Sequence, residues 1–184
     1  MNSMARFAAL VGVLAIAGSA GAQVTSFNGD TTGQPIWNRP VAGNPPTSLS
    51  GVGLTVTWQS QPLYVTVGGD YVFQETATGA WDNFTFLYQN SFDPNAQLTN
   101  VLIGNDDNPS VGLSGFTYNL TPGTQYFFIS TGFDTPDFGA FQVAITPPSG
   151  SGGVFLGTVP EPTSLALVGL GAGGFAWRRW RKKA

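Results

Sequence analysis

Apolar and polar residues alternate with a period of two through most of the middle of the chain. A period of two places every second side chain on the same face of a β-strand. Runs of this kind, and two nearly continuous apolar runs typical of strands buried on both faces, occupy residues 54–58, 63–67, 71–75, 84–89, 98–103, 116–120, 125–131 and 138–146. The pattern therefore predicts about eight strands and no helix between the two ends of the chain.

Turn residues separate these runs at intervals of about ten residues. Gly68, Gly69 and Asp70 lie between two alternating runs, which predicts a β-hairpin from 63–67 to 71–75. Many short antiparallel strands at even spacing favour a single antiparallel β-sandwich or jelly roll, so the fold class is all-β. Residues 34–50, which contain four prolines, are predicted to form an irregular arm over that sandwich.

The first 22 residues have the three parts of a secretory signal peptide. Arg6 supplies a positive charge, and Phe7–Ala17 is an apolar segment of 11 residues, too short to span a bilayer. The small residues Ala20, Gly21 and Ala22 predict cleavage by signal peptidase before Gln23. The chain is therefore expected to be exported, with an N-terminal signal helix that is removed.

The C-terminus has a second three-part pattern. It consists of Pro160-Glu161-Pro162, an apolar stretch over 164–177, and the basic residues Arg178, Arg179, Arg181, Lys182 and Lys183. As a helix, the apolar stretch would be about 21 Å long, and arginines at its end can snorkel to complete a membrane span. We expect a transmembrane helix whose basic end stays in the cytoplasm. The predicted organisation is signal peptide 1–22, sandwich 23–148, flexible Gly/Ser linker 149–157 and sorting signal 158–184.

This C-terminal pattern resembles the PEP-CTERM sorting signal, which is also catalogued as an ice-binding-protein C-terminal domain. The resemblance implies recognition of Pro160, Glu161 and Pro162 by an exosortase, a membrane enzyme that cuts near this motif and releases or re-anchors its substrate. It further implies transient anchoring by the C-terminal helix, followed by a place on the cell surface or in an extracellular polysaccharide matrix. A plain tail anchor is the alternative.

The middle of the chain, over residues 63–145, is similar to the small sandwich domains related to bacterial pre-peptidase C-terminal domains. The similarity rests on the strand rhythm and on the motifs Tyr71-Val72-Phe73, Trp81-Asp82-Asn83-Phe84, Asn105-Asp106-Asp107 and Gly123-Thr124-Gln125-Tyr126. Such modules accompany secreted enzymes, and some of them bind calcium or polymers. The resemblance therefore implies an accessory binding module.

Composition excludes several kinds of chemistry. The chain has no histidine and no cysteine, which excludes imidazole catalysis, thiol nucleophiles, disulfides and the usual zinc sites. Between the terminal segments, the chain has nine acidic residues and one basic residue, Arg39. This region therefore has a net charge near −8, and it contains no lysine. Nucleic-acid binding and Schiff-base chemistry are therefore not expected.

Oxygen ligands suit calcium, and the loop Asn105–Asn108 concentrates them. Asp106 and Asp107 are the candidate calcium ligands, and Asp134 and Asp137 could lie nearby. The alternative is that these residues serve only as turn and loop caps. A hydrolase that uses a pair of carboxylates is the one catalytic scheme that the composition permits, and no pair stands out.

Trp37 and Trp81 are candidates for stacking on sugar rings if they are exposed, whereas Trp58 falls in register with core positions. Taken together, the sequence predicts an exported, non-catalytic β-sandwich that acts as a structural or binding module. The alternatives are a calcium-dependent adhesion or glycan-binding module and, less favoured, a carboxylate hydrolase.

Overall fold

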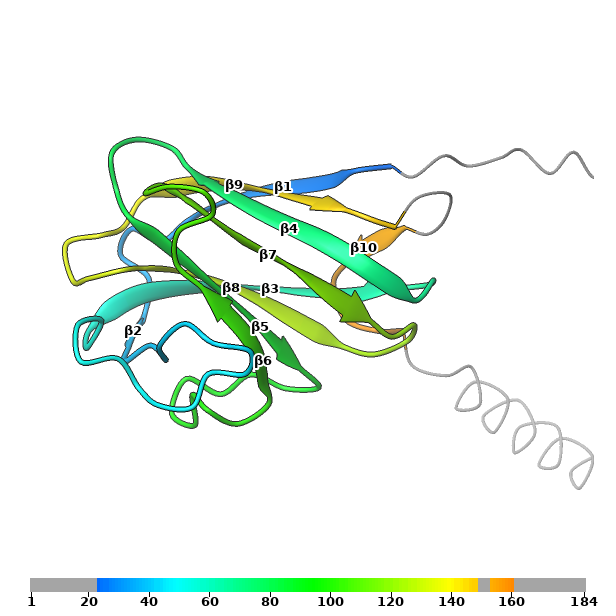
Figure 1. Cartoon of the computed structure of the whole chain (residues 1–184), viewed down its shortest axis with the longest axis horizontal. Helices are drawn as coiled ribbons and strands as arrows, with labels where there is room; N and C mark the ends of the chain where they lie inside the picture. Colours follow the sequence, from blue (N-terminus) through cyan, green and yellow to red (C-terminus); the bar gives the residue numbers. More distant parts are fainter. Residues whose placement is uncertain (1–22, 149–152, 161–184) are drawn as a thin grey trace, which may run out of the picture.

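The computed structural model describes residues 23–148 and 153–160, and within these ranges the chain forms ten strands and no helix. Every strand pair is antiparallel. The strands, drawn in Figure 1, are β1 (Thr25–Asp30), β2 (Ile36–Trp37), β3 (Val56–Val65), β4 (Gly69–Ala77), β5 (Asn83–Gln89), β6 (Val101–Asn105), β7 (Leu113–Leu120), β8 (Tyr126–Gly132), β9 (Ala140–Thr146) and β10 (Val154–Leu156).

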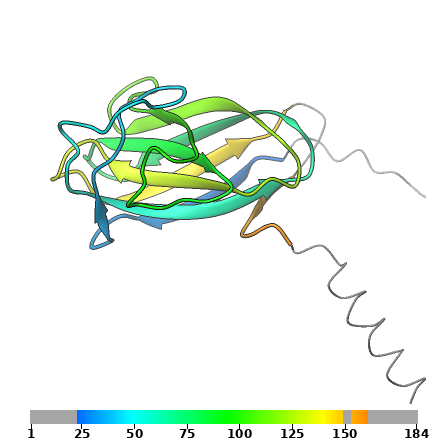
Figure 2. The ribbon, with the colours of Figure 1, turned by 90° about the horizontal axis from the view of Figure 1, so that it is seen from below.

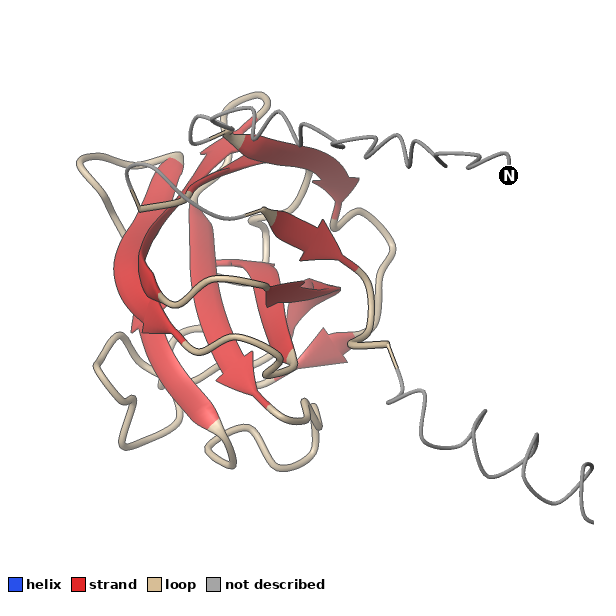
Figure 3. Ribbon diagram, turned by 90° about the vertical axis from the view of Figure 1, so that its right-hand side faces the viewer, coloured by secondary structure: helices blue, strands red, loops and turns tan. Residues whose placement is uncertain are grey.

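The strands form two sheets that face each other. The first sheet has the order β1-β9-β4-β7, and the second has the order β10-β3-β8-β5-β6, with β2 paired to β3. Figure 2 shows the sandwich from the side of the second sheet, and Figure 3 shows it from the end that carries residues 153–160. The pairs β1·β9, β3·β8, β4·β7 and β5·β6 nest inside one another along the chain, which is the strand order of a jelly roll. The predicted all-β, antiparallel sandwich is confirmed.

Aromatic side chains fill the space between the sheets. Phe73 of the first sheet stacks on Phe128 of the second with ring centroids 5.8 Å apart, and Phe116 lies 5.1 Å from Phe73. All three are at most 5% exposed and belong to one hydrophobic cluster. Burying such rings is the largest favourable contribution to folding in a chain without disulfides.

The second sheet is buried on its outer face as well. The arm of residues 34–50 covers it, and Trp37 packs edge-on against Phe86 with the ring centroids 5.6 Å apart. Phe86 and its strand neighbours Phe84 and Tyr88 point to this outer cluster, while Leu87 points to the core between the sheets. This double burial explains the apolar character of β5 and β8, and it confirms the predicted arm.

The hairpin predicted at Gly68 and Gly69 is wrong. Residues 56–65 form one continuous strand, β3, in the second sheet, whereas β4 belongs to the first sheet. The connection between them therefore crosses from one layer to the other. Alternation gives the spacing of apolar side chains, but two amphipathic strands can satisfy it equally well by pairing or by facing each other across a core.

The ends of the chain were only partly predicted. The strands β1, β2 and β10 were not among the expected runs, and β10 lies within residues 149–157, which we assigned to a flexible linker. The predicted signal helix at 1–22 and the predicted transmembrane helix at 164–177 lie outside the described residues. Among the described residues, no helix is long and apolar enough to span a membrane.

Candidate metal site at one end of the sandwich

Three acidic loops meet at one end of the molecule, on the left in Figure 1. Asp82 directly precedes β5, and Asp106 and Asp107 directly follow β6. The third loop, which contains Asp134 and Asp137, joins β8 to β9. These loops converge because β5 pairs with both β6 and β8, so that the start of β5 lies beside the ends of its two antiparallel neighbours.

The carboxylates of Asp82, Asp106 and Asp107 each offer one oxygen, and these three oxygens lie within 4.8 Å of one another. Asp82 and Asp106 are partly buried, and Asp107 is exposed. The Oδ1 atoms of Asp82 and Asp106 are buried and accept no hydrogen bond from the described part of the chain. Leaving a buried oxygen without a hydrogen bond costs about 1–3 kcal/mol of folding free energy. A ligand that binds both oxygens would remove this cost.

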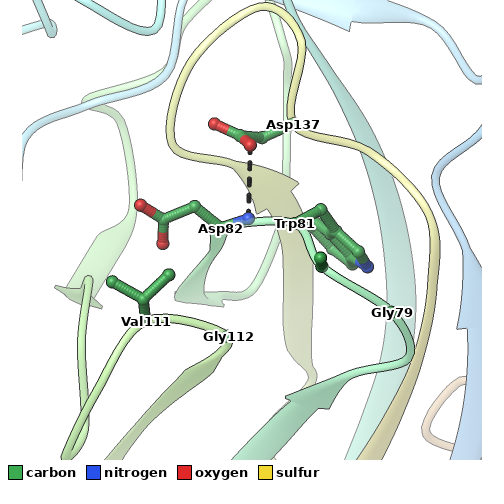
Figure 4. A pocket seen from close by; sticks show the side chains of 7 residues that line it. Gly79, Trp81, Asp82, Val111, Gly112 and Asp137 are labelled. Carbon is green, nitrogen blue, oxygen red and sulfur yellow. Dashed lines mark hydrogen bonds between the residues drawn. The ribbon is translucent and has the colours of Figure 1, made fainter.

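Asp137 and Asp134 have a different role. The Oδ1 atom of Asp137 accepts a hydrogen bond of 3.2 Å from the backbone N–H of Asp82, drawn as a dashed line in Figure 4, and its Oδ2 atom accepts one of 3.0 Å from the N–H of Asp134. The Oδ1 atom of Asp134 accepts from the N–H of Thr135. These two carboxylates therefore cap their loop, as predicted for aspartates in turns, and Asp137 also fixes the backbone that carries Asp82.

The asparagines of the 105–108 loop also serve the fold. The Nδ2 group of Asn108 donates to the carbonyl of Gly115, and the N–H of Gly115 donates to Oδ1 of Asn105. Gly115 must be glycine, because a Cβ there would overlap the carbonyl of Phe73 on the neighbouring strand. Both side chains therefore hold the loop against β7, which leaves the two aspartates between them as the free oxygen donors.

Burial and mutual repulsion shift the protonation of this cluster. Desolvation, followed by the charges of Asp106, Asp107 and Asp137, raises the pKa of Asp82 to about 6, and nearby Arg39 opposes the shift. Desolvation and Asp107 also raise the pKa of Asp106, again opposed by Arg39. A cation held by these carboxylates would relieve the repulsion that raises both pKa values.

A surface pocket of about 300 Å³ adjoins the cluster, with Asp82 in its wall. Its lining residues, all but Ala80 labelled in Figure 4, are Gly79, Ala80, Trp81, Asp82, Val111, Gly112 and Asp137. The pocket is large enough for a small ligand group, and it lies directly beside the converging carboxylates.

The structure corrects the proposed stacking role of the two tryptophans. Trp37 is 4% exposed, and its Nε1–H donates to the hydroxyl of Thr131. Trp81 is 7% exposed, its Nε1–H donates to the carbonyl of Ala140, and its ring points away from the carboxylates in Figure 4. Neither ring has a free face for a sugar, because aromatic burial in a chain with two hydrophobic clusters outweighs exposure.

Sequence reasoning selected Asp106 and Asp107 and missed Asp82 as their partner. Asp82 lies more than twenty residues earlier, and its only local signal is its position before an apolar strand. It joins the pair because β5 and β6 are neighbours, which is a fact of pairing and not of composition.

At the opposite end of the sandwich, the described chain ends at Pro160, which is exposed. Glu161, Pro162 and the basic residues Arg178, Arg179, Arg181, Lys182 and Lys183 lie outside the described residues.

Residues 158–182 match the PEP-CTERM protein-sorting motif. No curated protein matches the chain. The match confirms the predicted sorting signal. Four further points stay predictions: the signal peptide, the transmembrane helix, a location in the extracellular matrix, and the resemblance of the central domain to pre-peptidase C-terminal domains. The chain carries the signal of an exported protein that an exosortase-type enzyme sorts to the cell surface.

Proposed function

We propose that this exported protein is a non-catalytic surface module whose sandwich binds calcium through Asp82, Asp106 and Asp107 and uses the ordered loops to contact an extracellular polysaccharide. The observation that carries the proposal is the convergence of three carboxylates, two of which have a buried oxygen that receives no hydrogen bond from the described residues.

The donor set suits calcium. Calcium takes six to eight oxygen ligands and tolerates irregular geometry, and three carboxylates supply up to six oxygens, with water or backbone carbonyls available for the rest. The cluster contains no nitrogen or sulfur ligand, since the chain has no histidine or cysteine. A bound cation would satisfy Oδ1 of Asp82 and of Asp106 and would tie the loop before β5 to the loop after β6.

The position of the cluster supports a role in surface contact. Pro160 follows β10 near the start of β8, whereas Asp82 and Asp106 lie near its other end. The seven residues of β8 separate these ends, a distance of about 20 Å at the rise of an antiparallel strand. A protein held at its C-terminal signal would present the acidic loops and the adjoining pocket away from the membrane.

A thermal melt of residues 23–160 with millimolar calcium and then with a chelator tests the site. If calcium binds only the folded state, a hundredfold excess over the Kd adds about 2.7 kcal/mol to the free energy of unfolding, and we expect a rise in Tm of roughly 10 °C. Magnesium, which prefers a smaller and more regular octahedral site, should give a smaller rise.

When one of the three carboxylates is replaced, calcium should determine whether the variant or the wild type has the higher Tm. With chelator present, Asp82→Asn should melt above the wild type because it removes a repelled, partly buried charge. With calcium present, it should melt below the wild type because it loses a ligand. Asp70→Asn, which removes the same charge beside Asn119, is the control and should keep the full calcium response. Equal wild-type melting with calcium and with chelator would refute the calcium site.

Calcium affinity should fall as the pH decreases through the pKa of Asp82. Because this pKa is raised to about 6, the carboxylate is charged at pH 7.5 and mostly protonated at pH 5, where a proton competes with the metal. Isothermal titration of calcium at these two pH values should show at least tenfold weaker binding at pH 5. In Asp82→Asn the remaining pH dependence should be smaller, and a wild-type affinity that is unchanged at pH 5 would contradict the assignment.

A carboxylate hydrolase is the second candidate, and one observation favours it. Asp82 has a pKa of about 6 and lines a pocket, as a general acid would. Against this, one oxygen of each of the three carboxylates lies within 4.8 Å of the others, whereas glycoside hydrolases hold their two carboxyl groups about 5–10 Å apart, the wider spacing leaving room for the attacking water. Polysaccharide cleavage that Asp82→Asn abolishes would favour the hydrolase over the calcium module.

A further inference from the structure

The chain remains part of the sandwich up to the sorting motif. β10 pairs with β3, with Val154 opposite Val65 and Leu156 opposite Leu63. Val154 is 7% exposed and belongs to the central core. One residue beyond the strand, the N–H of Gly157 donates a 2.8 Å hydrogen bond to the carbonyl of Pro62.

Gln125 extends this attachment to Val159. Its Oε1 atom accepts a 2.7 Å hydrogen bond from the N–H of Val159. Its Nε2 group lies within hydrogen-bond distance of the carbonyls of Gly157, Leu63 and Tyr126, at 3.3, 3.1 and 3.0 Å. One partly buried side chain therefore joins β3, β8 and the segment that leaves β10.

The sorting motif begins within this attached segment. The match to the motif starts at Thr158, while Val159 is still bonded to Gln125 and Pro160 is exposed. One side of the backbone of residues 154–157 already pairs with β3 and Pro62, so an enzyme that must surround this segment as an extended substrate has to break those bonds first. Pro160, at which the described segment ends, is exposed and makes no hydrogen bond to the other described residues.

We propose that Gln125 is a positioning residue for the sorting reaction: together with β10 it confines cleavage to peptide bonds after Pro160, so that residues 154–160 remain in the mature protein. The inference uses the sorting signal and is independent of calcium. In the reaction, one peptide C–N bond breaks. The carbonyl carbon takes a nucleophile, either water or an acceptor amine, and the C-terminal fragment leaves with the proton on its new amino group.

The test expresses the full-length protein in a bacterium that contains an exosortase-type enzyme acting on it, and measures the intact mass of the mature product. The wild type should end at Pro160 or later. Gln125→Ala should increase the share of product that ends within 153–159 at least tenfold, because the segment can leave the sheet edge. Gln125→Glu should act in the same direction, since a carboxylate cannot donate to the carbonyls of Leu63 and Gly157.

Gln74→Ala is the matched control. The Nε2 group of Gln74 also lies within hydrogen-bond distance of three backbone carbonyls, those of Glu75, Asn108 and Ser114, but it does so on the first sheet. Its loss should lower Tm as the loss of Gln125 does, without moving the cleavage position.

Hydrogen exchange on the wild type tests the attachment without any variant. The amides of Gly157 and Val159 should exchange at least tenfold more slowly than that of Thr158, for which the structure shows no acceptor among the described residues. Equally fast exchange of all three amides would overturn the proposal. So would a wild-type product that ends within 153–159 or keeps the full C-terminus, or an unchanged cleavage position in a folded Gln125→Ala.

Discussion

Glu75→Gln should be more stable than the wild type above pH 7. The stability of the wild type should decrease between pH 5 and pH 9, and that of the variant should decrease much less. Glu75 lies on β4 and is fully buried. Its Oε1 atom accepts hydrogen bonds from Nδ2 of Asn83, at 3.0 Å, and from the hydroxyl of Ser130, at 2.8 Å. These partners belong to the other sheet, so the carboxyl group links the two layers.

The surroundings of Glu75 favour its neutral form. No charged partner reaches it among the described residues; its Oε2 atom has no hydrogen-bond partner, and neither has Oδ1 of Asn83. A proton on the carboxyl group would supply the donor that these oxygens lack. Desolvation raises the pKa of Glu75 from 4.5 to about 8, against the smaller lowering effects of Asn83 and Ser130.

The direction of the pH dependence follows from this shift. The folded state binds the proton more tightly than the unfolded state, so the contribution is fully present below about pH 4.5 and is lost as the pH rises through about 8. At about 1.4 kcal/mol per pKa unit, the loss amounts to as much as about 5 kcal/mol. Glutamine keeps the acceptor and carries its own donor, so it imitates the protonated acid at every pH.

Urea denaturation of both proteins from pH 5 to pH 9 measures this difference. The other acids are common to both, so the gap between the two curves isolates Glu75. Glu75→Ala is the control: it leaves the donors of Asn83 and Ser130 unpaired and should be less stable than Glu75→Gln at every pH. A constant gap between Glu75→Gln and the wild type across this range would show that Glu75 does not titrate.

Arg39→Lys should lower the free energy of unfolding by about 3–5 kcal/mol, although it preserves the charge. Arg39 is 2% exposed. Its Nε and Nη2 groups donate to the carbonyl of Phe133 at 3.0 and 2.9 Å, and Nη1 donates to the carbonyl of Pro40 at 3.0 Å. The guanidinium lies 4.0 Å from the ring centre of Phe84 and 4.9 Å from that of Phe133.

Lysine cannot reproduce this arrangement. An ammonium group lacks the planar fork that reaches two carbonyls at once, and it is more strongly hydrated, so its burial costs more. Gly53 packs on the arginine so closely that a Cβ would overlap its side chain, which shows how little room the site has to adjust. Arg39→Met, which keeps the length and loses the charge, should be destabilised to a similar extent.

Urea denaturation at neutral pH compares the three proteins, and an unchanged m-value would show that the unfolded state is unaffected. If the lysine variant stayed within about 1 kcal/mol of the wild type, the positive charge alone would account for the role of Arg39, and the geometric explanation would fail. The comparison also bears on the acidic loops, because Arg39 opposes the raised pKa values of Asp82 and Asp106.

Local patterns were sufficient to predict the fold class and the sorting signal. Alternation along residues 71–75, 84–89 and 116–120 reflects the two faces of a strand, which depend only on the backbone geometry of each segment. The motif at Pro160 is likewise contiguous in the chain, and its match begins at Thr158. Features of this kind need no knowledge of which segments meet in space.

Which strands pair, and which side chains meet, was determined only by the assembled sandwich. The layer change between β3 and β4 replaced the predicted hairpin, and the pairing of β5 with β6 brought Asp82 to Asp106. The burial of Trp37 followed from the arm that covers β5, and the seating of β10 on β3 turned part of an expected linker into an edge strand.

Each of these features joins residues that are distant along the chain. The free energy that decides between alternative partners comes from long-range packing and desolvation, and a period-two pattern is equally compatible with several such pairings. The residues next to an aspartate in the sequence do not show whether its carboxylate caps a turn, as that of Asp137 does, or lies close to two other carboxylates, as that of Asp82 does. Only the meeting of three loops at one end of the sandwich distinguishes the two roles.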